Sequence, residues 1–261
     1  MCYDSDARPP YPPISGGAAD GKDIVLTAQD GNQFTAYIAY AAQPTGPQIV
    51  IYPDVRGLHQ FYKELALRFA EVGVRALAID YFGRTAGLTP RDESFEYMPH
   101  VEKMTIPTFL TDVAAALAYL RGLSKTDRPT FIVGFCRGGT LALHTGAEEF
   151  DLAGVIPFYA GLSRPVPGSK GSTLEQAAKV RYPVLGLFGG ADPGIPASDI
   201  DQLDKQLDVA GVPHRIVTYE GAPHSFFDRK YAEYADASTD AWTRILNFIN
   251  TGTLSAREGV R

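Results

Sequence analysis

The residues best suited to nucleophilic chemistry lie at positions 134–138, Gly-Phe-Cys-Arg-Gly. Gly-x-Cys-x-Gly is the nucleophile-elbow pattern with cysteine in the usual place of serine. An apolar run at 131–133 predicts a buried strand before it, and a helical pattern follows over 137–149. The turn between them would hold the Cys136 thiol over a helix N-terminus, whose partial positive charge favours a thiolate or an oxyanion. By itself the motif also fits a small buried side chain in a tight turn.

Two further reactive residues follow later predicted strands. Asp192 ends the sequence Gly-Gly-Ala-Asp, and His224 begins the sequence His-Ser-Phe. A thiol needs a base to become a thiolate at neutral pH, and a histidine base needs an acid on its other ring nitrogen to fix its tautomer. A nucleophile, an acid and a histidine in this chain order predict a catalytic triad of Cys136, Asp192 and His224.

Strands and helices that alternate from residue 48 onward would position these groups. Strands are expected at 24–27, 34–40, 48–52, 74–79, 131–133, 154–159, 183–188 and 214–219. Helices are expected at 61–72, 107–120, 137–149, 173–179, 198–210 and 228–250, with irregular excursions at 85–106 and 163–181. This order predicts a mostly parallel, doubly wound α/β sheet flanked by helices, with its ligand site beyond the carboxyl ends of the strands. We expect an extended arm at 1–20, a single α/β domain at 21–252 and a C-terminal tail at 253–261.

The composition excludes several classes of function. The chain has 261 residues, 45% hydrophobic and 21% charged, which is ample for a core. Its formal net charge of −6 argues against nucleic-acid binding. No apolar run approaches the roughly 18 residues of a membrane span, and no signal peptide is visible. The two cysteines, Cys2 and Cys136, do not make a disulfide framework, so we expect a cytoplasmic protein in a reducing compartment.

The chain resembles the dienelactone hydrolase family of α/β-hydrolases. The matching motifs are Gly-Phe-Cys-Arg-Gly-Gly at 134–139, Gly-Gly-Ala-Asp at 189–192 and His-Ser-Phe at 224–226, and the similarity extends over about residues 22–250. The resemblance implies the α/β-hydrolase fold and hydrolysis of a carboxylic ester or lactone, as by a carboxymethylenebutenolidase, through a cysteinyl thioester. It also implies an oxyanion hole made of the backbone N–H groups of Val55 and Arg137.

This sequence departs from the family pattern at the residues of the expected substrate site. A carboxylate that faces the cysteine is commonly Glu in the family, and the matching residue here is the shorter Asp54, which also fits a turn-capping role. Family members that act on anionic dienelactones hold the substrate carboxylate with two arginines. Arg84 matches the first, but Asp228 stands at the position of the second and Arg229 follows it. The aromatic residues Tyr159, Phe82 and Phe226 are candidates for the pocket wall, and equally for core packing.

No cofactor or metal is expected. His100, His144 and His214 have no partners at metal-ligand spacing, and His59 fits a pocket wall or a helix start equally well. The expected partner is a small ester or lactone, bound by a monomer or homodimer. Two other functions stay open at this point: thioester hydrolysis by the same groups, and ligand binding or thiol sensing without turnover.

Overall fold

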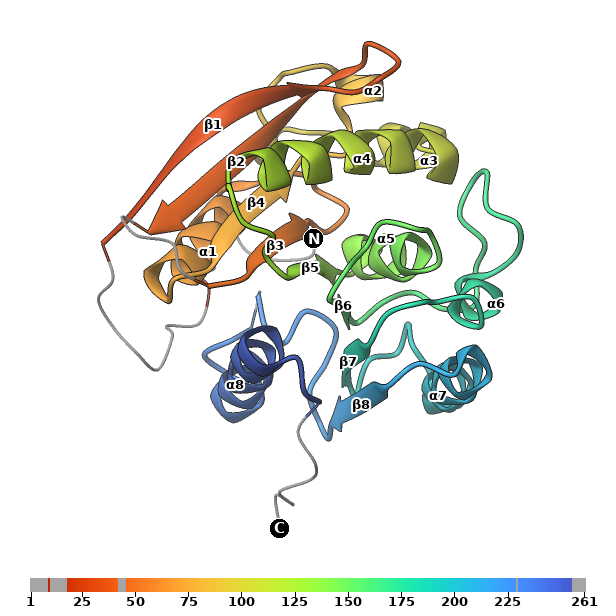
Figure 1. Ribbon diagram of the computed structural model, residues 1–261. Coiled ribbons are helices and arrows are strands. Elements are labelled where there is room, and N and C mark those ends of the chain that lie inside the picture. The colour runs from red at the N-terminus through yellow and green to blue at the C-terminus, as the bar shows by residue number, and fades with distance from the viewer. Residues whose placement is uncertain (1–8, 10–17, 42–45, 229, 255–261) are drawn as a thin grey trace.

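The computed structural model describes residues 9, 18–41, 46–228 and 230–254. These residues form an eight-stranded sheet with the order β1-β2-β4-β3-β5-β6-β7-β8 (Figure 1). The strands are β1 (Ala19–Thr27), β2 (Gln33–Ala41), β3 (Gln48–Tyr52), β4 (Arg75–Ile79), β5 (Thr130–Phe135), β6 (Gly154–Phe158), β7 (Val184–Gly189) and β8 (His214–Tyr219). β1 and β2 are antiparallel to their neighbours, and every pairing from β4 to β8 is parallel. The predicted mostly parallel α/β sheet is therefore confirmed.

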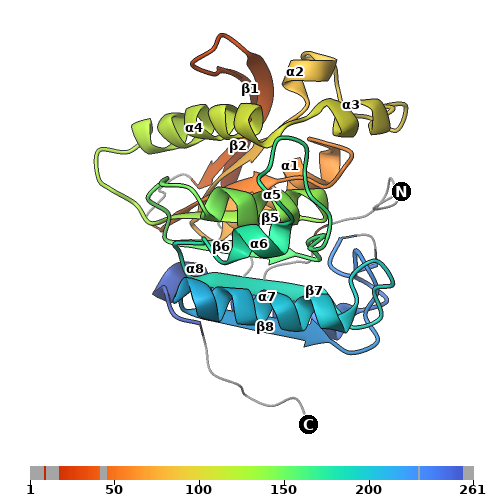
Figure 2. The ribbon, with the colours of Figure 1, turned by 90° about the vertical axis from the view of Figure 1, so that its right-hand side faces the viewer.

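Helices cover both faces of this sheet. Figure 1 shows α1 and α8 on one side and α4, α5 and α7 on the other, and Figure 2 turns the second side toward the viewer. The helices are α1 (Gln60–Glu71), α2 (Gly83–Ala86), α3 (Met98–Lys103), α4 (Ile106–Gly122), α5 (Arg137–Gly146), α6 (Thr173–Ala177), α7 (Ala197–Ala210) and α8 (Ala235–Thr251). Among the described residues, no helix is both long and apolar enough to cross a membrane.

The core is built from both faces of the central strands. Every residue of β3, β4, β5, β6 and β7 is buried, as expected for parallel strands covered on both sides. On one face, α1 contributes Phe61, Leu65 and Phe69, and the Phe69 ring packs 4.9 Å from the Trp242 ring of α8. Burying a large apolar side chain contributes about 1.5–3 kcal/mol. These contacts hold the strands, and therefore the loops at their carboxyl ends, in fixed positions.

Some element boundaries differ from the sequence prediction. The first strand begins at Ala19, within the expected arm, because Ala19 pairs with Ala41 in the sheet. The last helix begins at Ala235 rather than at residue 228, since a series of turns occupies the segment before it and Asp228 is fully buried. The helix after the elbow ends at Gly146, three residues early. The excursion at 85–106 contains the short helix α3.

Candidate active site

The turn between β5 and α5 has the geometry of a nucleophile elbow. Cys136 lies at the N-cap of α5 with φ 54° and ψ −112°, a conformation that is costly for a residue with a side chain. Its N–H donates to the Phe158 carbonyl at 3.1 Å, which helps to hold the turn. A Cβ on Gly134 would overlap the carbonyl oxygen of Gly138, and a Cβ on Gly138 would overlap that of Tyr52. Both glycines of the motif are therefore required by close backbone approach.

The structure brings Asp192 and His224 together beside this turn. His224 Nδ1–H donates to Asp192 Oδ2 at 2.5 Å, so Nε2 is the ring nitrogen that does not contact this acid. The other carboxylate oxygen, Oδ1, accepts the Gly194 N–H at 2.8 Å. The Asp192 side chain is only 2% exposed, whereas that of His224 is 33% exposed. A buried acid thus fixes the tautomer and orientation of a histidine that is partly exposed to solvent.

His224 is also hydrogen-bonded to the Cys136 side chain. Burial by itself lowers the pKa of His224, but the hydrogen bonds with Asp192 and Cys136 outweigh it and raise this pKa to about 10. An imidazolium beside a cysteine stabilises the thiolate. The three predicted triad residues therefore form one connected chain of side chains, from thiol to imidazole to carboxylate.

A cavity of about 600 Å³ opens over Cys136 and His224. Its wall comes from the segments that follow the carboxyl ends of β3, β4, β5, β6, β7 and β8, with α3 on one side. The apolar lining residues are Val55, Met98, Val101, Leu162 and Ile195. Among the described residues no Asp or Glu lines the cavity, and its charged or titratable groups are Cys136, His224 and two arginines, Arg137 and Arg164.

Two backbone N–H groups are candidate donors for an oxyanion hole. Val55 follows β3 and Arg137 begins α5, and both line the cavity with Cys136. Neither N–H donates to another backbone group in the described residues. Since the first N–H groups of a helix have no partner within it, the Arg137 N–H is free to bind an oxyanion.

Comparison with known proteins agrees with this fold. The model of the dienelactone hydrolase family matches residues 34–253. The chain belongs to the dienelactone hydrolase family. A carboxymethylenebutenolidase of Rhodococcus opacus is 29% identical over 261 residues, which cover 95% of this chain and 96% of that protein. The resemblance stated from the sequence motifs is confirmed, and the chain is a hydrolase of this family.

Solved structures share the fold. A crystal structure from Klebsiella pneumoniae subsp. pneumoniae superimposes with a TM-score of 0.77 and 24% identity, over 89% of this chain and 98% of that one. The dienelactone hydrolase-like promiscuous phosphotriesterase P91 from metagenomic libraries gives a TM-score of 0.70 at 22% identity, over the same shares of the two chains. The α/β-hydrolase fold is therefore confirmed.

Asp54, which stands where this family commonly has Glu, is fully buried under the nucleophile. Its Oδ1 accepts the Arg56 N–H at 2.8 Å, so it caps the turn after β3. Its Oδ2 has no hydrogen-bond partner in the described part of the chain. Burial, followed by the charges of Asp228 and Cys136, raises the pKa of Asp54 well above its usual range. Oδ1 therefore caps the turn, and the raised pKa favours the protonated form of Asp54.

Arg84, the first arginine expected to bind a substrate carboxylate, lies outside the cavity wall. Arg84 donates to Asp112 at 2.8 and 2.9 Å and pairs with Asp30 at 2.6 Å, and it does not line the cavity. Its guanidinium is occupied by two carboxylates, so its position does not support a substrate-binding role. Arg229 lies outside the described residues. Asp228, at the family's arginine position, is fully buried beside Tyr159 and Asp54.

The three predicted aromatic residues separate into a wall residue and two core residues. Tyr159 lines the cavity, and its ring centroid lies 4.9 Å from that of His224. Phe82 is fully buried against Tyr81 and is absent from the cavity wall. Phe226 is buried as well and packs behind Tyr159, with ring centroids 5.8 Å apart. Only Tyr159 is placed to touch a ligand.

The remaining histidines lie away from the cavity. His59 is buried, and its pKa is lowered to about 4, mainly by burial and next by the charge of Arg56. His144 lies 3.4 Å from the Thr173 hydroxyl, and burial and the charge of Arg137 lower its pKa to about 4. The ring of His100 stacks on Phe95. None of the three has a position that contributes to the triad.

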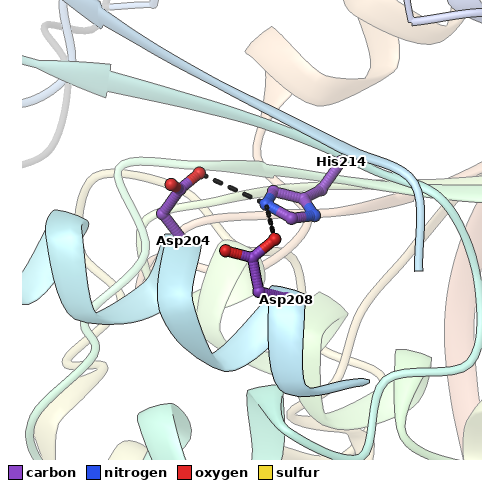
Figure 3. Close-up of side chains that lie close together, drawn as sticks. All are labelled: Asp204, Asp208 and His214. Atoms are coloured by element: carbon purple, nitrogen blue, oxygen red, sulfur yellow. Dashed lines mark ion pairs between the residues drawn. The ribbon is translucent and has the colours of Figure 1, made fainter. Parts of the chain in front are cut away.

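The prediction that His214 has no partners at metal-ligand spacing is wrong. Figure 3 shows its ring facing Asp204 and Asp208, one turn apart on α7. His214 Nε2 lies 3.3 Å from Asp204 and 3.9 Å from Asp208, and the three groups lie within 4.8 Å of one another. Both carboxylates are exposed, and His214 Nδ1–H donates to the Val212 carbonyl at 2.9 Å. We interpret the cluster as an ion-paired contact between α7 and β8.

Sequence reasoning missed two charged residues of the cavity. Arg137 was considered only for its backbone N–H, yet its side chain also lines the cavity. Arg164 follows β6 and contributes to the same wall. The signal for Arg137 was present, because the residue after an elbow nucleophile lies at the entrance of the site. The position of Arg164 depends on an irregular loop, for which the sequence offers no pattern.

Proposed function

We propose that this protein hydrolyses carboxylic esters or lactones through a thioester on Cys136. The observation that supports this most strongly is the connected chain of Cys136, His224 and Asp192, with the thiol on a strained elbow under an apolar cavity. Strain at such a position costs on the order of 1–3 kcal/mol and persists only where the surrounding structure holds it. Membership of the dienelactone hydrolase family supports the same activity.

In the first half-reaction the Cys136 thiolate attacks the substrate carbonyl carbon. A C–S bond forms, and the carbonyl electrons move to oxygen, where the N–H groups of Val55 and Arg137 stabilise the negative charge. The tetrahedral intermediate collapses as the C–O bond to the leaving group breaks. Protonated His224 donates its proton to the departing alkoxide and so becomes neutral.

In the second half-reaction His224 acts as a base. Acylation removes the Cys136 charge and its hydrogen bond to His224, two of the interactions that raise the pKa of this histidine. The neutral ring then accepts a proton from water, whose oxygen attacks the thioester carbonyl. The C–S bond breaks, the carboxylic acid leaves, and the thiolate–imidazolium pair re-forms. Asp192 keeps Nδ1 protonated throughout and so directs Nε2 to the reaction.

The raised pKa of Asp54 supports this cycle, because it favours the protonated form of this buried acid. An ionised carboxylate in its position would repel the Cys136 thiolate, whose charge already raises the pKa of Asp54. A neutral Asp54 avoids that repulsion. The protonated form of Asp54 therefore favours the thiolate form that the first step requires.

The test compares the two cysteines of the chain. Cys136→Ala should lower kcat/KM for 4-nitrophenyl butyrate and for a neutral lactone by at least about 10³-fold, because no nucleophile remains. Cys2→Ala is the matched control and should leave the rate within about twofold. Turnover by purified Cys136→Ala close to that of the wild type would contradict the proposal.

A further inference from the structure

A buried ion pair lies beside the cavity without lining it. Asp80 follows β4, and Arg91 comes 11 residues later, in the excursion that leads to α3. Arg91 Nη2 donates to Asp80 Oδ2 at 2.8 Å, and the two side chains are only 1% and 0% exposed. Withdrawing two charges from water is costly, and such a pair is often no more stabilising than apolar side chains of the same volume. Stability alone therefore does not account for this pair.

Arg91 holds the segment that connects α2 to α3. Its Nη2 also donates to the Gly87 carbonyl at 2.7 Å, and its Nη1 donates to the Thr89 hydroxyl at 2.8 Å. The guanidinium carbon lies 4.6 Å from the centre of the Phe95 ring. The Phe95 ring in turn stacks on the ring of His100, which belongs to α3, with their centres 5.1 Å apart. One guanidinium thus connects the end of β4 to α3 through a turn and two rings.

The same ion pair borders the loop that carries Val55, a candidate oxyanion donor. A Cβ on Gly57 would lie 2.8 Å from Asp80 Oδ1 and 3.2 Å from Arg91 Cγ, so this loop packs directly on the pair. The Leu58 N–H also interacts with the Asp80 carboxylate. Burial raises the pKa of Asp80, and the charge of Arg91 is the largest influence that lowers it. Arg91 therefore favours the ionised carboxylate, which accepts hydrogen bonds most strongly.

The position of α3 in the fold indicates which part of a substrate it would contact. Cys136 follows β5, which lies between β4 and β8 in the sheet order. The ion pair ties α3 to the β4 side, whereas His224 follows β8, so the two lie on opposite sides of the nucleophile (Figure 2). Since His224 protonates the leaving group, the acyl chain extends away from it, toward α3. There Met98 and Val101 of α3 line the cavity.

We propose that Arg91 is a positioning residue that holds α3 as the wall of the acyl pocket and thereby sets the acyl-chain specificity of the enzyme. This inference rests on the proposed ester or lactone hydrolysis and assigns a specificity to the same site. Arg91 does not line the cavity, so it acts through α3 and not by contact with the substrate. Contact with one methylene group in a hydrophobic pocket changes kcat/KM by about 10- to 200-fold, so a displaced wall has a measurable effect.

The kinetic test uses two esters with the same leaving group, 4-nitrophenyl hexanoate and 4-nitrophenyl acetate; spontaneous hydrolysis is subtracted from both. Arg91→Met should lower kcat/KM for the hexanoate by about tenfold or more. The loss for the acetate should be less than about threefold, because its single methyl group offers little contact with α3. Arg91→Lys should fall between the wild type and Arg91→Met, since lysine keeps the charge but cannot donate to Asp80, Gly87 and Thr89 together.

Arg84→Met is the matched control, because it breaks an ion pair of the same chemistry outside the cavity. Its ratio of kcat/KM for hexanoate to that for acetate should stay within about twofold of the wild-type ratio. Equal losses for both esters in folded Arg91→Met would overturn the inference, because they would indicate general damage to the site and not a displaced wall. An unchanged ratio in Arg91→Met would overturn it as well.

Two further variants keep the test decisive if Arg91→Met folds poorly. Arg91→Met/Asp80→Asn leaves no unpaired charge of this pair and should lose the same hexanoate preference as Arg91→Met, since both substitutions remove one shared interaction. Phe95→Leu removes only the ring that connects Arg91 to His100 and should lower the ratio by a smaller factor, about two- to fivefold. A wild-type ratio in both variants would contradict the proposed positioning.

Amide hydrogen exchange tests the contact without turnover. In Arg91→Met, peptides that cover α3 should exchange faster than in the wild type, whereas peptides that cover α5 should not change. Unchanged exchange in α3 would contradict the tie between Arg91 and this helix. If α3 exchanges faster while the wild type hydrolyses neither ester, the proposed function fails and the positioning contact stands. If the wild type hydrolyses both esters and Arg91→Met keeps the wild-type ratio, the proposed function stands and this inference fails.

Discussion

Two histidines at opposite ends of β8 each lie beside acidic side chains. Only His224 and its acid lie next to a nucleophile and a cavity. His214 begins the strand and His224 follows its end. The acids beside His214 are more than half exposed, at 54% and 73%, and lie 3.3 and 3.9 Å from the ring. The acid beside His224 is 2% exposed and lies at 2.5 Å.

The difference follows from which end of the sheet each histidine occupies. The loops at the carboxyl ends of parallel strands converge, so His224 meets a nucleophile, an acid and a cavity. His214 lies at the amino end, where its ring faces the exposed Asp204 and Asp208 of α7 (Figure 3). Similar residue types thus give a reactive site at one end and a surface ion pair at the other.

Among these predictions, removal of the buried acid beside His224 should have the largest effect on the rate. Asp192→Asn should lower kcat/KM for a neutral ester by roughly 10³-fold or more, because the amide no longer fixes the productive His224 tautomer. Asp204→Asn makes the same chemical change at the exposed histidine and should alter the rate by less than about twofold. Steady-state kinetics on both variants, with circular dichroism to confirm folding, would measure this. Equal losses of kcat/KM in the two variants would contradict a catalytic role that is specific to Asp192.

Asp54 extends the comparison to a buried acid without a histidine. Its folded-state pKa is raised above 3.8, so the folded protein retains a proton that the unfolded chain releases as pH increases. The stability associated with Asp54 is present below about pH 4 and is lost as pH rises toward the folded-state pKa. The Asp54→Asn variant does not show this loss, because an amide does not titrate in this range. The Tm of the variant should therefore rise relative to that of the wild type by a few degrees between about pH 4 and pH 8.

The control for this experiment is Asp208→Asn, which changes a carboxylate in contact with water. We expect no comparable gain in Tm there, because an exposed carboxylate is not desolvated by folding. Scanning calorimetry over the same pH series would measure both variants. A Tm of Asp54→Asn that falls relative to the wild type as pH rises would show that Asp54 is ionised in the folded protein.

Sequence reasoning worked where the chemistry depends on local pattern and chain order. The elbow glycines, Asp192 and His224 each follow a recognisable strand, and the parallel sheet brings their loops together. It did not work for Arg84, because Asp30 and Asp112 that hold it come from a turn and a helix far away in the sequence. It also missed the cavity-lining position of Arg164, since this residue lies on an irregular loop for which the sequence offers no pattern.

Several features expected from the sequence remain predictions. Cys2 and Arg229 lie outside the described residues, so the role of Arg229 at the site stays a prediction. Cytoplasmic location, the monomeric or homodimeric state and the absence of nucleic-acid binding stay predictions as well. They do not affect the chemistry assigned to Cys136, Asp192 and His224.

The most direct test of the account is the mass of the protein during turnover. Wild-type enzyme is mixed with excess 4-nitrophenyl butyrate, quenched in acid within the first turnover, and examined by intact mass and peptide mapping. We predict one butyryl group on the Cys136 peptide, formed together with one equivalent of nitrophenolate and removed by hydroxylamine as a thioester is. Turnover without an acyl group on Cys136 at any quench time would contradict nucleophilic catalysis by this residue.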